Sequence, residues 1–133
     1  MDKRILSTGI ILGMTAVILG AFGAHALKKV LSIEQLATFE TGVRYQMYHA
    51  LFILAVGIMK DISQKAKKTI FFLVLFGVIL FSGSIYLLAT NDLTTFDFKI
   101  IGFVTPIGGL LLILAWGVLL ATILNKKSQN QEN

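Results

Sequence analysis

The chain has 133 residues, of which 56% are hydrophobic and 14% are charged, and its mean hydropathy is +0.81. A typical soluble domain has about 25% charged residues, so this composition excludes an ordinary water-soluble fold. The net charge is +5, but the basic residues cluster between apolar segments instead of forming the stripe typical of nucleic-acid binding. The chain has no cysteine, which excludes disulfides, thiolate catalysis and sulfur-ligated metals.

Four apolar stretches are long enough to cross a bilayer as helices. A helix rises about 1.5 Å per residue and the hydrocarbon core is about 30 Å thick, so a span needs about 20 mostly apolar residues. The stretches cover about residues 5–27, 42–59, 69–90 and 100–124. They predict an all-α membrane protein, a bundle of four transmembrane helices in which residues 1–133 form a single transmembrane domain.

The first stretch carries small residues on one side. At 100° per residue they fall within an arc of about 100°; they are Gly9, Gly13, Ala16, Gly20, Gly23 and Ala24. Because lipid tails are as apolar as leucine, membrane helices associate where small residues let two backbones come close. This stripe predicts a helix-packing surface, either within the bundle or between copies of the chain.

The second stretch is the shortest, but Ser32 and Gln35 have the spacing of a capping box, which predicts that this helix begins near Ser32. Polar groups within a span are costly and are therefore functional candidates. The first half of this helix carries Glu40, Arg44, Tyr45, Gln46, Tyr48 and His49. Glu40 and Arg44 lie one turn apart, and we predict an ion pair held by the hydroxyl of Tyr48.

The third and fourth stretches add polar residues at a similar depth if the helices alternate in direction. Ser82, Ser84 and Tyr86 come from the third stretch, and Thr105 comes from the fourth. The other half of each helix carries no ionisable residue, so the sequence predicts no proton or ion relay across the membrane.

Pro106 leaves two readings of the fourth stretch open, because proline lacks a backbone N–H. It kinks a helix that already runs through it, or Thr105 caps a helix that starts at Pro106 and residues 92–104 form an outer surface segment. In either case Gly108 and Gly109 allow a close approach by another backbone or a ligand.

Lysine and arginine near the span ends predict the orientation, because cytoplasmic loops are enriched in them. Eight lie on the side of the termini and the middle loop: Lys3, Arg4, Lys60, Lys65, Lys67, Lys68, Lys126 and Lys127. Four lie on the other side: Lys28, Lys29, Lys99 and Arg44. We expect both termini in the cytoplasm (N-in/C-in).

Four runs of sequence resemble one family of small membrane proteins. They are residues 20–27 (GAFGAHAL), 41–51 (TGVRYQMYHAL), 81–86 (FSGSIY) and 105–109 (TPIGG). Together they resemble the domain of unknown function 423 family, which includes transmembrane protein 256 of animals. The chain departs from the family pattern where Ala115, in place of the usual glycine, precedes Trp116. The resemblance implies a four-helix protein of the bacterial cytoplasmic (inner) membrane and implies no activity.

The runs coincide with the polar residues, which we therefore treat as one set, the polar constellation. Its members are Glu40, Arg44, Tyr45, Gln46, Tyr48, His49, Ser82, Ser84, Tyr86 and Thr105. One reading is structural: an interfacial ion pair, an aromatic belt and a histidine that hydrogen-bonds a neighbouring helix. The other is an outward-facing pocket for a headgroup or a small molecule.

For function we expect a non-enzymatic membrane component that binds a lipid, a small molecule or a partner protein through this pocket. No cofactor, metal or nucleic acid is expected; His25 and His49 lack ligand spacing. Membrane lipids, a second copy of the chain or another membrane protein are the expected partners. The alternative is a small oligomeric transporter or channel, although the first helix lacks the acidic residue that small four-helix exporters use. An enzyme based on His49 would lack a recognisable nucleophile.

Overall fold

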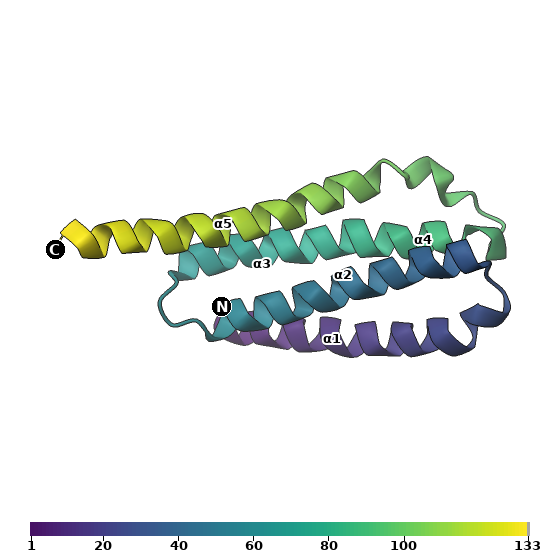
Figure 1. Ribbon diagram of the computed structural model, residues 1–133, viewed down its shortest axis with the longest axis horizontal. Helices are drawn as coiled ribbons and strands as arrows, with labels where there is room; N and C mark the ends of the chain where they lie inside the picture. Colours follow the sequence, from purple (N-terminus) through teal and green to yellow (C-terminus); the bar gives the residue numbers. More distant parts are fainter. Residues whose placement is uncertain (133) are drawn as a thin grey trace.

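The computed structural model describes the backbone of residues 1–132 and the side chains of residues 1–126, and every element in that part of the chain is helical. The α-helices are α1 (Asp2–His25), α2 (Ile33–Ile58), α3 (Gln64–Val78), α4 (Ser84–Ala89) and α5 (Val104–Glu132). A π-helical turn, Ile79–Gly83, joins α3 to α4, so the two form one helical rod (Figure 1). Short 3₁₀ turns occur at Leu27–Lys29, Asn91–Leu93 and Phe98–Ile101.

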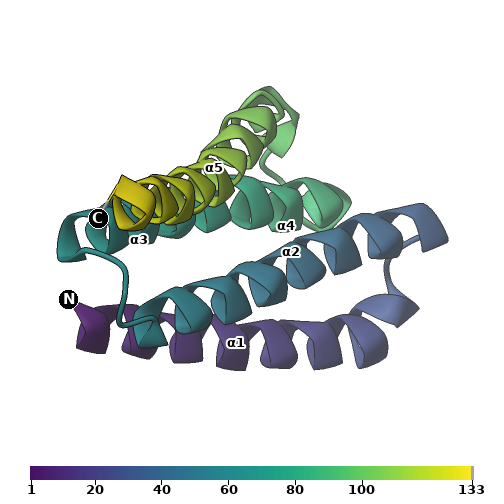
Figure 2. The same ribbon diagram turned by 60° about the vertical axis from the view of Figure 1, so that its left-hand side comes forward.

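The four rods lie side by side in chain order, each antiparallel to the next (Figures 1 and 2). Helix α1 packs along α2, α2 contacts α3 and α4, and α3 with the π-helical turn packs along α5. We call the end that holds residues 1–4, the α2–α3 loop and residues 122–126 the terminal end, and the end that holds residues 26–32 and 90–103 the far end. The arrangement is more open than the expected bundle, because α1 and α5 lie on the outside of the row.

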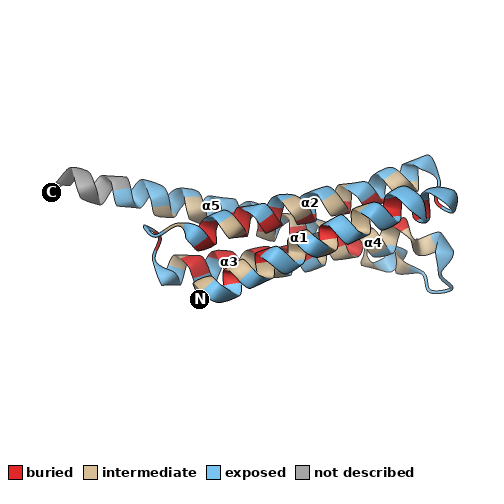
Figure 3. Cartoon of the chain, turned by 90° about the horizontal axis from the view of Figure 1, so that it is seen from below, coloured by how far each residue is buried: buried red, intermediate tan, exposed pale blue. Residues whose placement is uncertain are grey.

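Three stretches are long and apolar enough to cross a membrane: Asp2–Lys29, Gln64–Ala89 and Phe98–Lys126. Helix α2 is not among them, because polar side chains in its first half lower its hydropathy. The outer surfaces of α1 and α5 are largely exposed (Figure 3) and carry large apolar side chains such as Val17 and Ile113. Such continuous apolar surface suits contact with lipid.

The predicted start of α2 is confirmed. Ser32 is the N-cap: its hydroxyl accepts a hydrogen bond from the backbone N–H of Gln35 at 3.1 Å, and its own N–H donates to the Gln35 side chain at 2.9 Å. This reciprocal capping box satisfies two N–H groups that would otherwise lack partners at the helix end. Helix α2 is therefore longer than the apolar stretch of residues 42–59 suggested.

The first reading of Pro106, a kink within a helix, is wrong, and the second is confirmed in part. Helix α5 begins at Val104, so Pro106 is its third residue and Thr105 lies inside the helix instead of capping it. The N–H groups of a first helical turn have no acceptor within the helix, so proline costs no hydrogen bond there. Residues 90–103 form a surface segment with two 3₁₀ turns, as the second reading expected.

The small-residue stripe of α1 meets α2 of the same chain. A Cβ added at Gly9 would lie 2.8 Å from the Leu54 side chain, and one at Gly23 would lie 3.1 Å from the ring of Phe39. A Cβ at Gly20 would be in ordinary contact with Val43, at 3.4 Å, and Ala16 is buried. Ala24 is the exception, because it is exposed. The stripe is used within the chain, where it brings the two backbones together.

A buried lysine fastens the terminal end. Lys67 is 2% exposed; its ammonium lies 3.1 Å from the carboxylate of Asp2 and donates to the carbonyl of Gly57 at 3.3 Å. These contacts join the N-terminus of α1, the C-terminal part of α2 and the first turn of α3. An apolar core that includes Ile5 and Val74 lies beyond these contacts, toward the middle of the molecule.

Candidate functional site

Gln46 is the centre of a buried hydrogen-bond network between three helices. Its amide nitrogen donates to the carbonyl of Leu12 at 2.9 Å and to the hydroxyl of Thr15 at 2.7 Å, both on α1. Its amide oxygen accepts a hydrogen bond from the hydroxyl of Tyr86 on α4 at 2.7 Å. Gln46 is 5% exposed. Helix α2 is thereby bonded to the helices on both sides of it.

Ser82 lies in the π-helical turn, which contacts both α2 and α5. It is completely buried, and its hydroxyl donates to the carbonyl of Gly42 on α2 at 2.7 Å. A Cβ at Gly42 would meet the Tyr86 ring at 2.7 Å, so glycine is needed for this approach. On the other side of the turn, a Cβ at Gly108 of α5 would meet backbone atoms of residues 80 and 81. The π-helical turn is held between two glycines.

His49 is buried, and both of its ring nitrogens are occupied. Nδ1 lies 2.8 Å from the carbonyl oxygen of Tyr45, and Nε2 accepts a hydrogen bond from the indole N–H of Trp116 at 3.1 Å. Because a carbonyl only accepts and an indole N–H only donates, the proton belongs on Nδ1 and the imidazole is neutral. The Trp116 ring also packs on Phe52, with centroids 4.1 Å apart. This contact links α5 to α2.

The remaining pair joins Ser84, which is buried, to Thr105, which is partly buried. Their hydroxyl oxygens are 2.6 Å apart, and Ser84 also donates to the carbonyl of Phe81 at 3.0 Å. The pair joins α4 to the first turn of α5. Six members of the polar constellation are thus hydrogen-bonded where helices meet: Gln46, His49, Ser82, Ser84, Tyr86 and Thr105.

The other four members, Glu40, Arg44, Tyr45 and Tyr48, lie on the exposed side of α2. The predicted ion pair between Glu40 and Arg44 is wrong: the guanidinium of Arg44 donates to the hydroxyl of Thr41 at 3.2 Å, and Glu40 has no ion-pair partner among residues 1–126. The rings of Tyr45 and Tyr48 contact edge to face, with centroids 5.5 Å apart. Tyr45 also packs on Phe81.

The constellation therefore divides into a buried or partly buried part that connects helices and an exposed part on α2. In the described side chains, no buried polar atom lacks a hydrogen-bond partner. Four hollows lined by described residues include no member of the constellation. The polar residues are brought together at one depth, as expected, but they line none of these four hollows.

The sequence did not indicate three partners of this network: Leu12, Thr15 and Trp116. Leu12 contributes only a carbonyl, which no side-chain pattern reveals. Thr15 lies among apolar residues of α1, and its hydroxyl also donates to the carbonyl of Ile11 at 2.9 Å. The signal for Trp116 is its indole N–H, because an indole N–H within a span needs an acceptor such as His49.

Comparisons with known proteins agree with the resemblance in the four runs. The family described as a protein of unknown function, DUF423, matches residues 19–109. A UPF0382 membrane protein of Staphylococcus saprophyticus is 41% identical over 86% of this chain and 91% of its own length. The UPF0382 inner membrane protein YgdD of Escherichia coli is 39% identical over 86% of this chain and 85% of its own length. YwdK of Bacillus subtilis, also a UPF0382 membrane protein, is 37% identical over 86% of this chain and 90% of its own length.

No solved structure matches the chain. The family match and the relatives each cover most of the chain, and one relative is an inner membrane protein. With three apolar helical stretches long enough to span, they identify a helical, multi-pass protein of the cytoplasmic membrane whose activity is unknown. The chain belongs to the DUF423 (UPF0382) family of membrane proteins.

Proposed function

We propose that the protein is a non-enzymatic component of the cytoplasmic membrane that crosses the bilayer four times and binds a lipid through the exposed polar side of α2. The arrangement of the rods supports four crossings. Helix α1 runs from the terminal end to the far end, whereas α3 starts again at the terminal end. If the three apolar stretches span, α2 must return the chain across the membrane.

Charge supports an orientation with the terminal end in the cytoplasm. Within residues 1–126, seven basic side chains lie at or near that end: Lys3, Arg4, Lys60, Lys65, Lys67, Lys68 and Lys126. Only two acidic side chains, Asp2 and Asp61, accompany them. The far end has basic and acidic side chains in similar number. This asymmetry favours N-in/C-in, because lysine and arginine accumulate in cytoplasmic loops.

Glu40 and Arg44 carry the lipid proposal, because both are exposed and neither has an ion-pair partner among residues 1–126. The two residues are one helical turn apart, so their side chains start about 5 to 6 Å from each other. A zwitterionic headgroup such as phosphoethanolamine presents an ammonium and a phosphate joined by a two-carbon link. The carboxylate of Glu40 would accept from the ammonium, and the guanidinium of Arg44 would donate to the phosphate.

The depth of these residues suits a headgroup in the outer leaflet. Phe39, which packs on Gly23 and Tyr86, marks the level near which α1 and α4 end. Arg44 lies five residues further along α2, about 7.5 Å deeper, and a long arginine side chain extends back to the interface. Below it Tyr48 and Leu51 are exposed and offer a surface for an acyl chain.

Lipid retention measured by native mass spectrometry in mild detergent tests this site. We expect Arg44→Gln to weaken retention of phosphatidylethanolamine about tenfold or more, because a hydrogen bond to a charged group contributes about 1.5 to 3 kcal/mol. Lys99→Gln, which removes another exposed charge at the far end, is the matched control and should leave retention unchanged. Equal retention by the wild type and Arg44→Gln would reject the headgroup site.

The geometry of His49 favours a non-enzymatic role. A general base needs a free nitrogen within reach of the substrate, whereas both nitrogens of His49 have partners within the protein. A transporter assembled from several copies predicts a different result: solute flux in reconstituted vesicles. Flux above that of empty vesicles would favour that alternative over the binding role.

A further inference from the structure

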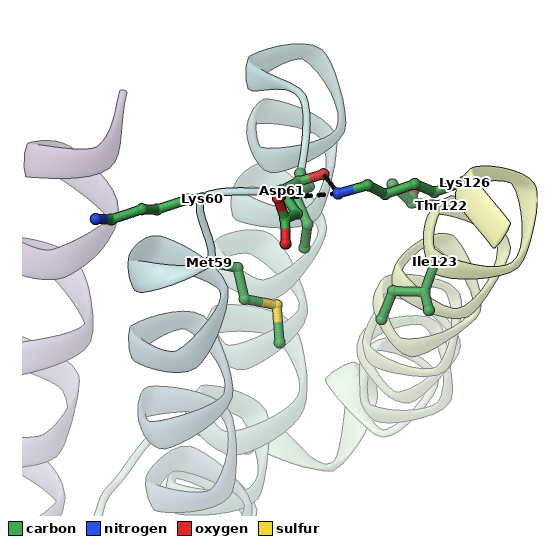
Figure 4. A pocket seen from close by; sticks show the side chains of 7 residues that line it. Met59, Lys60, Asp61, Thr122, Ile123 and Lys126 are labelled. Carbon is green, nitrogen blue, oxygen red and sulfur yellow. Dashed lines mark hydrogen bonds and ion pairs between the residues drawn. The ribbon is translucent and has the colours of Figure 1, made fainter. Parts of the chain in front are cut away.

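Two hollows flank an ion pair at the terminal end. The carboxylate of Asp61 in the α2–α3 loop and the ammonium of Lys126 on α5 are 3.0 Å apart, and Lys126 also donates to the Asp61 carbonyl at 3.4 Å. Figure 4 shows this pair spanning from the loop to α5, with Met59 and Ile123 beneath it and Lys60 pointing away. The first hollow, of about 310 Å³, is lined by the ion pair together with Met59 and Ile123.

The second hollow, of about 540 Å³, lies between the start of α3 and residues 122–126 of α5. Lys65 and Lys126 line it, together with the polar side chains of Ser63, Thr69 and Asn125. Asp61 is the one acidic residue among its lining residues, and Lys126 neutralises it. Lys65 is exposed and has no ion-pair partner among residues 1–126. The hollow therefore has a net positive charge.

An apolar groove continues from this hollow toward the middle of the molecule. Thr69 lines both the charged hollow and a further hollow of about 240 Å³, whose other walls are Phe72, Leu73, Phe76 and Leu111. On α3, positions 65, 69, 72 and 76 fall within about 60° of one another, so they form one straight edge. From Lys65 to Phe76 this edge is about 16 Å long, close to one leaflet of a hydrocarbon core about 30 Å thick.

We infer that the groove between α3 and α5 binds an anionic phospholipid of the leaflet at the terminal end. The phosphate would lie between Lys65 and Lys126, and one acyl chain would extend past Thr69 along Phe72 and Phe76. The positive hollow at the headgroup level and the apolar groove of one-leaflet length together fit this occupant. The inference relies on the four-span arrangement proposed above but not on the lipid site near Arg44.

The proposed N-in/C-in orientation supports an anionic lipid in this groove. With the terminal end in the cytoplasm, the groove faces the leaflet whose anionic lipids attract basic side chains near the surface. Each such lysine contributes about fivefold to binding of an anionic surface. Loss of both lysines should therefore weaken retention of the lipid about 25-fold.

Native mass spectrometry with added phosphatidylglycerol or phosphatidylcholine tests the site in the full chain. We expect Lys65→Gln with Lys126→Gln to weaken retention of phosphatidylglycerol about 25-fold and to weaken that of phosphatidylcholine, whose headgroup has no net charge, much less. The matched control is Lys28→Gln with Lys29→Gln, two exposed lysines at the far end, which should have no effect. Equal losses in both double variants would mean that the lysines attract lipid only by net charge, and would overturn the site.

Two further variants distinguish lipid binding from a structural role of the ion pair. Asp61→Asn removes the acidic group and frees Lys126, so it should strengthen phosphatidylglycerol retention; weaker retention would contradict the inference. Leu111→Trp should fill the groove and reduce retention with both lysines intact.

Inorganic phosphate at millimolar concentration should not displace the lipid, and displacement would show a phosphate site without a chain groove. Arg44→Gln should leave these results unchanged, which separates this site from the one on α2.

Discussion

Gln46 shows how a polar side chain is accommodated between packed membrane helices. Its amide group makes three hydrogen bonds, to Leu12, Thr15 and Tyr86, and each partner is on another helix. A buried polar group costs free energy unless it is hydrogen-bonded, so residues at such a centre depend on one another. Substitutions of two partners should therefore not be additive.

Gln46→Leu and Tyr86→Phe test this dependence. Each alone should lower the free energy of unfolding by about 1 to 2 kcal/mol, because it leaves the other side chain without its partner. The double variant should lose less than the sum, by about 0.6 to 1.7 kcal/mol. Unfolding in mixed micelles of lipid and detergent measures all three. Strict additivity would mean that Tyr86 and Gln46 do not bond in the folded protein.

At single residues, sequence reasoning succeeded where local chemistry decides the outcome and failed where it does not. Ser32 and Gln35 cap α2 as predicted, because the capping box lies within four consecutive residues. Glu40 and Arg44 do not pair, although their spacing permits it, because Arg44 finds the nearer hydroxyl of Thr41. Exposed pairs contribute about 0 to 1 kcal/mol, which is too little to fix a side chain against such competition.

At the scale of elements, the π-helical turn decides how α5 packs. Gly108 approaches the backbone of that turn: a Cβ there would lie 2.7 Å from the carbonyl carbon of Leu80 and 2.8 Å from the Cα of Phe81. Backbone atoms cannot move aside as a flexible side chain can. Close approach near Gly108 and Gly109 was expected from the sequence, but the π-helical turn that receives it has no sequence signature of its own.

Gly108→Ala should destabilise the protein by about 1 to 3 kcal/mol, as overpacking in a tight interface does. Gly117→Ala is the matched control on the same helix, because a Cβ at that position meets nothing within 4 Å. It should be neutral or slightly stabilising, since alanine favours a helix over glycine. Thermal melting in detergent compares the two variants. If both melt together, α5 does not pack on the turn through Gly108.

The packing of α1 on α2 could be predicted only in part from the sequence. The stripe from Gly9 to Gly23 revealed a packing surface, because small residues recurred on one side of a helix. It did not reveal the partner, which is α2 of the same chain. Which surfaces meet depends on contacts between distant residues, such as Gly23 with Phe39. The buried Lys67 was missed for a similar reason: its partners Asp2 and Gly57 belong to other helices.

At the scale of the whole molecule, the terminal and far ends differ in their charged and polar side chains. The terminal end has an excess of basic side chains and the charged hollow beside Lys126, and the far end has the exposed polar part of α2. Both proposed lipid sites require these ends to lie on opposite sides of one bilayer. That requirement depends on α2, the helix whose hydropathy is too low for it to be recognised as a span by composition alone.

Labelling of single cysteines tests the crossing of α2 most directly, because the natural chain has no cysteine. Thr95→Cys marks the far end and Lys60→Cys marks the terminal end; both positions are exposed. In right-side-out vesicles of the cytoplasmic membrane, a membrane-impermeant maleimide should label Thr95→Cys before lysis and Lys60→Cys only after lysis. Labelling of both cysteines from the same side would contradict the four-span arrangement, and the reverse pattern would contradict the cytoplasmic placement of the termini.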